Sequence, residues 1–163
     1  MVPQGMGQSD KSFVGVISDT HGLVRPQALA ALAGAERIMH AGDIGHPAVL
    51  AALEAIAPVV AVRGNNDQDA WAAAIPETAI VEVDGLRLYM LHDVKTLDFD
   101  PAAAGFSGVI CGHSHRPRLE LQAGVWFINP GSAGPRRFTL PVTVARLYVH
   151  GGRLTAELVE LHI

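Results

Sequence analysis

The sequence predicts a single α/β domain in which parallel strand–helix units come first, antiparallel hairpins follow, and two sheets result. Three observations support this prediction. The chain has 163 residues, of which 49% are hydrophobic and 17% charged, a composition typical of a folded domain rather than a disordered chain. The first half alternates short apolar runs with polar loops and Ala/Leu segments that begin at proline. The second half pairs apolar runs across glycine-containing turns, a pattern typical of hairpins.

The first half is expected to form parallel strands with helices packed on them. Its apolar runs are too short for globular helices and fit buried strands, and a proline suits the first position of each helix. The expected elements are a strand at 13–18, a helix at 26–33, a strand at 36–40, a helix from 47 to about 56 and a strand at 58–62. The polar loops follow the carboxyl ends of these strands, where open α/β sheets bind ligands.

The second half is expected to form hairpins around one further strand. Asp84-Gly85 is a two-residue turn of the type that hairpins favour. The expected elements are strands at 78–83 and 86–91, a short Ala-rich helix near 101–104, a strand at 108–111, and strand pairs at 119–121 with 125–128 and at 142–149 with 153–161. The order of the strands within the sheets does not follow from the sequence.

Composition and charge exclude several classes of protein. The single cysteine, Cys111, allows neither an internal disulfide nor a cysteine-based zinc cluster. No apolar run reaches the roughly 18 residues of a membrane span. Residues 1–11 resemble a flexible leader rather than a secretory signal, which leaves 12–163 as the domain and suggests a cytoplasmic location. The net charge, 12 − 16 = −4, argues against strong nucleic-acid binding. The sequence allows a homo-oligomer.

Oxygen and imidazole side chains follow five of the predicted strands. These residues are Asp19, His21, Asp43, Asn65, Asp67, His92, His113 and His115. In an extended segment residues i and i+2 point to the same side, so Asp19 and His21 are expected to face one point, and the same spacing holds for His113 and His115. Each short pattern alone is common, but together they indicate a metal site. Mixed carboxylate and imidazole donors suit Mn, Fe, Zn, Co or Ni.

This series of motifs resembles the calcineurin-like metallophosphoesterases, and in particular their small single-domain bacterial and archaeal phosphodiesterase branch. The resemblance rests on Asp19-x-His21, Gly42-Asp43, Gly64-Asn65-x-Asp67, His92 and Gly112-His113-x-His115, with Asn129-Pro130-Gly131-Ser132 also typical of that branch. It covers the chain from Ser12 onward. It implies a four-layer α/β/β/α sandwich of two mixed β-sheets flanked by helices.

The resemblance also implies two divalent transition-metal ions. By it, one ion is held by Asp19, His21 and His115, the other by Asn65, His92 and His113, and Asp43 bridges the two. A hydroxide between two such ions is a nucleophile at neutral pH, and the ions polarise the phosphate under attack. The expected activity is hydrolysis of small phosphate esters, with phosphodiesters more suitable than monoesters.

Two residues depart from the family pattern. Asn66 stands where many members have a histidine that can protonate the leaving group. An amide can donate a hydrogen bond to phosphate but cannot act as an acid. Because an acid accelerates such reactions by roughly 10²–10⁴-fold, acidic leaving groups are expected to be preferred, with Asp43 and Asn66 as the catalytic side chains. Asp93 stands where glycine commonly follows the ligand histidine, and we interpret it as an exposed loop acid rather than a residue that orients an imidazole.

The remaining polar residues have less specific interpretations. His40 is expected to be a packed or hydrogen-bonded neighbour of the site, His46 a solvated loop residue and Cys111 a small core residue. Arg25, Arg136 and Arg137 could pair with a substrate phosphate, although arginines are common on surfaces.

An interaction scaffold is the main alternative to an enzyme. The retromer subunit that shares this fold works through protein surfaces and has lost full catalytic competence. The present chain keeps all seven expected ligands, which favours the enzyme.

Overall fold

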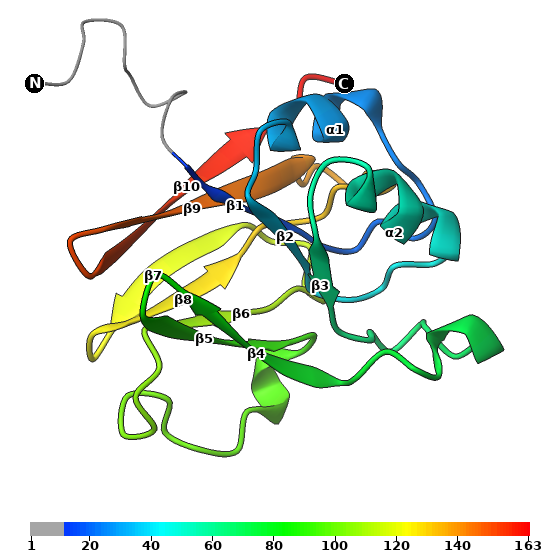
Figure 1. The fold of residues 1–163 in the computed structure, drawn as a ribbon. Coiled ribbons are helices and arrows are strands. Elements are labelled where there is room, and N and C mark those ends of the chain that lie inside the picture. Colours follow the sequence, from blue (N-terminus) through cyan, green and yellow to red (C-terminus); the bar gives the residue numbers. More distant parts are fainter. Residues whose placement is uncertain (1–11) are drawn as a thin grey trace, which may run out of the picture.

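Two mixed five-stranded sheets form the centre of the molecule (Figure 1). The computed structural model describes residues 12–163, so the leader expected at 1–11 lies outside the described residues. The elements are β1 (Val14–Ile17), α1 (Pro26–Leu32), β2 (Arg37–His40), α2 (Pro47–Glu54), β3 (Val59–Ala61), the 3₁₀ helix η2 (Ala70–Ala72), β4 (Thr78–Val83), β5 (Leu86–Leu91), the 3₁₀ helix η3 (Val94–Thr96), β6 (Gly108–Ile110), β7 (Arg118–Gln122), β8 (Val125–Asn129), β9 (Thr143–His150) and β10 (Arg153–Glu160).

The first sheet joins the two ends of the described chain. Its order is β10-β9-β1-β2-β3. Strands β1, β2 and β3 run parallel, with Val14 opposite Arg37, whereas β9 pairs with β1 antiparallel. All four residues of β1 are buried, which explains why its sequence is a continuous apolar run rather than an alternating one.

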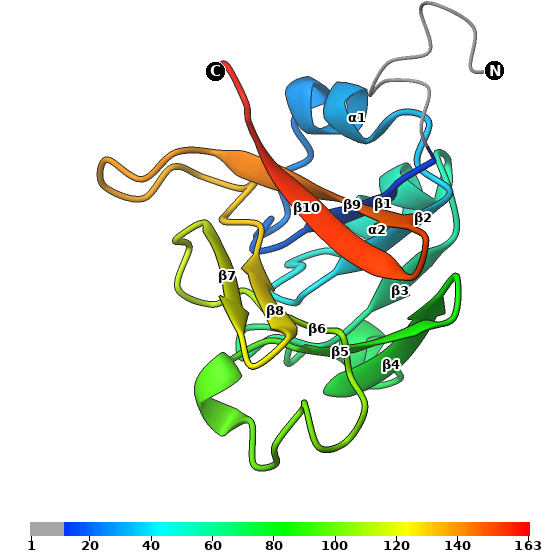
Figure 2. The same cartoon turned by 90° about the vertical axis from the view of Figure 1, so that its left-hand side faces the viewer.

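The second sheet has the order β4-β5-β6-β8-β7. Its first hairpin matches the predicted bounds at both strands, because the two-residue turn at Asp84-Gly85 sets the register that pairs Val83 with Leu86. Strand β6 runs parallel to β5 and β8. The two sheets stack face to face (Figure 2).

Three apolar layers hold the sandwich together. Helices α1 and α2 cover the outer face of the first sheet, where Leu32 and Leu53 are fully buried. Between the sheets, Met39 from β2 packs with Met90 from β5 in a second cluster. A third cluster on the outer face of the second sheet is covered by Val94 and its neighbours. The expected four-layer α/β/β/α class is confirmed.

The fourth layer contains less helix than the sequence suggested. The Ala-rich helix predicted near 101–104 is wrong: these residues form turns, and Asp100 accepts hydrogen bonds from the backbone N–H groups of Ala102 and Ala103. The segment instead places Phe99 and Phe106 against Tyr89, with ring centroids 4.9 and 5.4 Å away. No helix between residues 12 and 163 has the length and apolarity needed to cross a membrane.

Candidate metal centre

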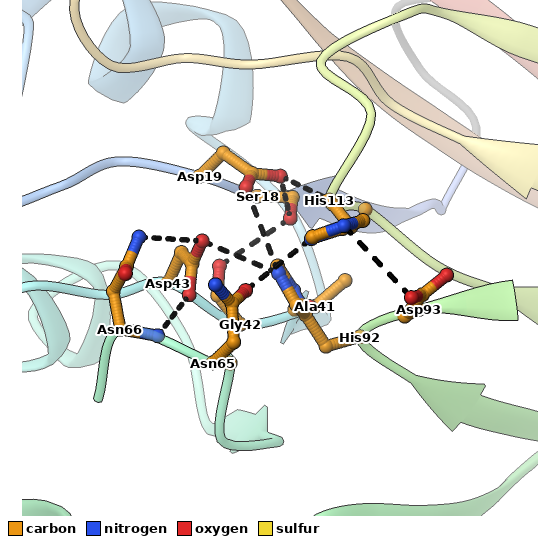
Figure 3. A network of polar contacts seen from close by, with 12 residues as sticks. Ser18, Asp19, Ala41, Gly42, Asp43, Asn65, Asn66, His92, Asp93 and His113 are labelled. Atoms are coloured by element: carbon orange, nitrogen blue, oxygen red, sulfur yellow. Dashed lines mark hydrogen bonds and ion pairs between the residues drawn. The ribbon is translucent and has the colours of Figure 1, made fainter. Parts of the chain in front are cut away.

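Loops that follow β1, β2, β3, β5 and β6 bring the predicted ligands together. Figure 3 shows Asp19, Asp43, Asn65, His92 and His113 among them. The carboxylate and imidazole ligands form two groups, in each of which the ligand atoms lie within 4.8 Å of one another: Asp19, His21 and His115 in the first, and Asp43, His92 and His113 in the second. All seven expected ligands therefore lie at one place, since Asn65 Oδ1 is 3.3 Å from His113 Nδ1.

The first group is tightly gathered around Asp19. Its Oδ1 atom lies 3.3 Å from His115 Nε2 and 3.9 Å from His21 Nε2. The other oxygen, Oδ2, accepts hydrogen bonds from Ser18 Oγ at 2.6 Å and from the His113 backbone N–H at 3.0 Å. The carboxylate is thus fixed through one oxygen. Its second oxygen faces the imidazoles of His21 and His115, and His92 Nε2 of the second group is also 3.9 Å away.

Asp43 contacts both groups. Its Oδ2 atom is 3.3 Å from His92 Nε2 in the second group and 3.9 Å from His21 Nε2 in the first. Asn66 donates to this carboxylate twice, from its backbone N–H to Oδ1 at 2.9 Å and from Nδ2 to Oδ2 at 3.2 Å. Asn66 therefore positions Asp43, and the second Nδ2 hydrogen is left to point elsewhere.

The donor set fits divalent cations. The buried atoms Asp19 Oδ1 and His92 Nε2 have no hydrogen-bond partner among residues 12–163, a state that buried polar atoms rarely adopt without a ligand. The Nε2 atoms of His21 and His115 face each other at 3.4 Å. A cation between these nitrogen and oxygen lone pairs would satisfy them, and the mixture of donors suits a transition metal.

Hydrogen bonds set the orientation of His92. Its Nδ1 lies 2.7 Å from the carbonyl oxygen of Ala41. Because a carbonyl oxygen only accepts, we assign the hydrogen to Nδ1, which leaves Nε2 with a lone pair in the neutral ring. Burial opposes the charged ring, but Asp43 and Ala41 outweigh it and raise the pKa of His92.

The two carboxylates remain charged despite burial. Burial alone would raise the pKa of Asp43, but His92 and the Asn66 backbone N–H lower it to about 2. Burial likewise opposes ionisation of Asp19, and His115 and Ser18 overcome it and lower its pKa. Two charged carboxylates at the centre would attract divalent cations and partly neutralise their charge.

Most of the ligand residues have a left-handed backbone conformation, which sets the direction of their side chains. Asp19, His21, Asp43, His113 and His115 all have φ between 47° and 72°, a region that non-glycine residues seldom occupy. The expected alternation of extended residues therefore does not apply here. Asp19 and His21 fall in one group, whereas His113 and His115 fall in different groups, because the chain turns between them.

Two glycines of the motifs are required for close packing. A Cβ atom at Gly64 would clash with Asp43 Oδ1, and one at Gly112 would clash with Ser18 Oγ. Any side chain at either position would push a carboxylate loop out of place. This explains why Gly64 precedes Asn65 and why Gly112 precedes His113.

Asp67 has a structural role that the sequence did not reveal. Its carboxylate accepts hydrogen bonds from the backbone N–H groups of Ile44, Gly45 and Gly64, each at 3.0 Å. It thereby ties the loop after β2 to the loop after β3. The spacing Asn65-x-Asp67 was the available signal, but it does not distinguish a ligand from a carboxylate that binds backbone.

His40 does not face the ligand groups. As the sequence suggested, it is a buried neighbour that hydrogen-bonds to the loops of the centre. The Gly42 N–H donates to its Nδ1 at 3.1 Å, and its Nε2 lies 3.0 Å from Thr20 Oγ1. Thr20 in turn donates to the Ile44 carbonyl at 2.9 Å. Complete burial lowers the pKa of His40 to about 4, so the ring is neutral and links the Asp19 and Asp43 loops.

Comparison with known proteins agrees with this geometry. Residues 13–152 match the model of the calcineurin-like phosphoesterase superfamily domain. The chain belongs to this superfamily. A probable metallophosphoesterase of Methanothermobacter thermautotrophicus is 34% identical over 160 residues, which cover 91% of this chain and 92% of the relative.

Solved structures show the same fold for this phosphoesterase domain. An archaeal phosphodiesterase superposes with a TM-score of 0.75 and 24% identity, over 90% of this chain and 99% of the other. Vps29 of Chaetomium thermophilum superposes with a TM-score of 0.75 and 18% identity, over 92% and 96% of the two chains. At these identities the likeness concerns the fold alone.

Several polar residues around the candidate metal centre have local roles. Arg25 donates to the Gly134 carbonyl at 3.2 and 3.4 Å, and exposed His46 caps α2 by accepting from the Ala48 N–H. Asn129 donates to the Gly112 carbonyl at 2.9 Å and supports the His113 loop. Burial raises the pKa of Cys111 to about 12, consistent with a core residue.

Three hollows open from the centre. The first, beside β4, is lined by Arg63, Glu77 and the two histidines of the second group. The second runs past His113 and Ser114 toward Arg118 and Arg137. The third is lined by His21, Asn66, His115, Pro135, Arg136 and Arg137. A phosphate at the centre would therefore be reached from several sides.

Proposed function

We propose that this domain is a two-metal phosphoesterase that hydrolyses small phosphodiesters. The observation that carries the proposal is the pair of ligand groups, each within 4.8 Å, with the Asp43 carboxylate in contact with both. Unpartnered, buried Asp19 Oδ1 and His92 Nε2 support it. The similar archaeal phosphodiesterase favours diesters over monoesters as the substrate class.

We infer that the side chains divide between two cations. Asp19, His21 and His115 would hold one, Asn65, His92 and His113 the other, and Asp43 would contact both. Bound there, two divalent transition-metal ions (Mn, Fe, Zn, Ni or Co) would supply activation of a water molecule near neutral pH and polarisation of the phosphate oxygens.

The remaining chemistry falls to side chains that orient rather than transfer protons. Asn66 holds Asp43 through two hydrogen bonds, and its free amide hydrogen is available to a phosphate oxygen. It cannot protonate a leaving group. Diesters whose leaving group departs as a stable anion are therefore the favoured substrates, and an aryl phosphate should react much faster than an alkyl phosphate.

The test combines metal content with turnover. Protein stripped with a chelator and reloaded with each metal is assayed with bis(p-nitrophenyl) phosphate, and bound metal is measured by mass spectrometry. We expect about two equivalents of metal and metal-dependent hydrolysis. Asp43→Asn should lower metal content and reduce turnover by roughly 10³-fold. Asp84→Asn removes the same charge from the β4–β5 turn, far from the centre, and serves as the control.

The outcomes separate the enzyme from its alternative. Full metal content and full turnover in Asp43→Asn would overturn the proposal. Metal binding without turnover of any diester in the unmodified protein would favour an interaction scaffold instead. Equal turnover of bis(p-nitrophenyl) phosphate and a dialkyl phosphate would contradict the expected preference for acidic leaving groups.

A further inference from the structure

Two adjacent arginines beside the centre have no partner among residues 12–163. Arg136 and Arg137 lie in the connection between β8 and β9 and are exposed. Neither side chain makes a hydrogen bond or ion pair with any residue in the described range 12–163. In the hollow beside β4, by contrast, Arg63 is paired with Glu77 at 3.0 Å. Unneutralised arginine charge therefore lies on one side of the centre.

The base of this loop is fixed to the first ligand group. The Ala133 N–H donates to the Ser18 carbonyl at 3.1 Å, and Ser132 Oγ donates to the Asp19 carbonyl at 3.0 Å. Arg25 holds the Gly134 carbonyl from the other side. Beyond this base, the Leu140 N–H donates to the Arg137 carbonyl at 3.1 Å and closes a turn. The two arginines are consequently attached to the frame that positions Asp19.

Both arginines line one hollow with the two histidines of the first group. Its other lining residues are His21, Asn66, His115 and Pro135. Arg137 also lines the neighbouring hollow with His113, so it stands at the junction of the two. A group attached to a phosphate at the centre and extending into this hollow would meet both guanidinium groups.

Among the described residues that line it, this hollow has two cationic side chains but none that is free to act as an acid. His21 and His115 are proposed ligands, Asn66 has no acidic proton, and arginine stays protonated. A leaving group that enters the hollow must therefore depart as an anion. Arginine binds phosphate through paired N–H groups, and a phosphate monoester, whose second pKa is about 6, departs at neutral pH without a proton from the protein.

We propose that Arg136 and Arg137 bind a phosphate leaving group, so that the substrates of this centre are phosphoanhydrides esterified at each phosphorus, such as a dinucleoside diphosphate. This proposal rests on the proposed function. For P1,P2-diadenosine diphosphate, a P–O bond forms to water while the bond from that phosphorus to the bridging oxygen breaks. The products are two AMP molecules, and the two protons of water pass to the solvent.

The experiment compares three substrates in the metal-loaded protein. They are diadenosine diphosphate, the dinucleotide ApA, whose leaving group is an alcohol, and bis(p-nitrophenyl) phosphate. We expect kcat/KM for the anhydride to exceed that for ApA by roughly 10²-fold or more, since no acid assists the alcohol. Arg136→Gln/Arg137→Gln should lower kcat/KM for the anhydride about tenfold, and hydrolysis of bis(p-nitrophenyl) phosphate less than about threefold.

The control removes the same charge elsewhere. Arg37→Gln/Arg153→Gln changes the arginines at the start of β2 and at the start of β10, and should leave all three activities unchanged. Arg136→Lys/Arg137→Lys keeps the charge and should restore part of the anhydride activity. Calorimetric titration with AMP gives a readout independent of turnover. AMP should bind about tenfold more weakly to Arg136→Gln/Arg137→Gln, and with unchanged affinity to Arg37→Gln/Arg153→Gln.

The results distinguish this proposal from the one on which it depends. If bis(p-nitrophenyl) phosphate is hydrolysed but the anhydride reacts no faster than ApA, the leaving-group proposal is wrong and the phosphoesterase stands. Equal losses in the two glutamine double variants, or unchanged AMP binding, would also overturn it. Absence of metal-dependent hydrolysis of every substrate would overturn both.

Discussion

Individual ligands of the two groups differ in how deeply they are buried. In the first group the Asp19 side chain is completely buried and that of His115 is 3% exposed. In the second group the side chain of His113 is 45% exposed. His113 and His115 come from the same loop, so a single residue, Ser114, separates a buried ligand from an exposed one. Asp43 and His92 of the second group are buried, with side chains 4% and 6% exposed, and His21 of the first group is 23% exposed. It is therefore His113 that faces solvent and the entering substrate.

The largest expected difference concerns these two histidines. His115→Ala removes a buried ligand that no nearby side chain can replace, so affinity for one metal should fall by roughly 100-fold or more. His113→Ala opens a position that water can fill, and we expect about a tenfold loss at the other metal. Titration of the stripped protein with Zn²⁺ against a chromophoric chelator measures both. Equal losses in the two variants would contradict the contrast between the groups.

The free energy of unfolding should depend on pH through His40, the buried histidine that links the Asp19 and Asp43 loops. In the metal-free protein the pKa of His40 is about 4 when folded and ordinarily about 6.5 when unfolded. Between these values the unfolded state binds more protons, so the free energy of unfolding falls as the pH is lowered from 6.5 to 4, by about 3 kcal/mol in total. Folding raises the pKa of His92, so this ring does not add to the loss of stability. The lowered pKa values of Asp19 and Asp43 add a smaller loss only as the pH approaches 4.

Urea unfolding between pH 6 and 4 measures this dependence. His40→Gln should remove most of the slope, and His162→Gln at the exposed end of the chain should leave it unchanged. Nuclear magnetic resonance of the His40 ring offers a second reading, in which no titration is expected above about pH 5. An ordinary histidine titration near pH 6.5 would refute the neutral, buried ring.

The smallest effect is expected at the exposed edge of the second group. Asp93 Oδ2 lies 3.8 Å from His113 Nε2, and both side chains are partly exposed, so solvent screens the pair. Asp93→Asn should change affinity for the second metal by only about two- to threefold. Asp98→Asn, in the same segment, is the matched control. A loss of tenfold or more would show that Asp93 orients the imidazole after all.

Local patterns predicted the parts of the fold that depend on neighbours in sequence. The hairpin at Asp84-Gly85 matched because a two-residue turn sets its own register. The helix expected near 101–104 failed because four residues cannot sustain a helix against the carboxylate of Asp100, which binds the backbone as a turn. The insertion of β9 beside β1 joins residues more than 120 positions apart, and no periodicity encodes that pairing.

The candidate centre shows the same division. The ligand side chains could be predicted because they recur at strand ends as a recognisable series. The residues that hold them were predicted only in part. His40 was expected as a neighbour of the site, but neither its partners nor the role of Asp67 could be predicted, since both residues act through backbone groups of other loops. A carboxylate that binds three N–H groups and one that binds a metal look alike in sequence. Only the folded chain shows which way each one faces.

The left-handed backbone at five of the ligand residues has a consequence for transplantation. Each such conformation costs a free chain on the order of 1 kcal/mol or more, and these five residues adopt it because neighbouring loops and strands hold them there. A short peptide bearing Asp-Thr-His or His-Ser-His would relax and lose the arrangement. To graft this centre onto another scaffold, the interlocked loops must be transferred as a unit, since the ligand side chains alone do not specify the backbone conformation that positions them.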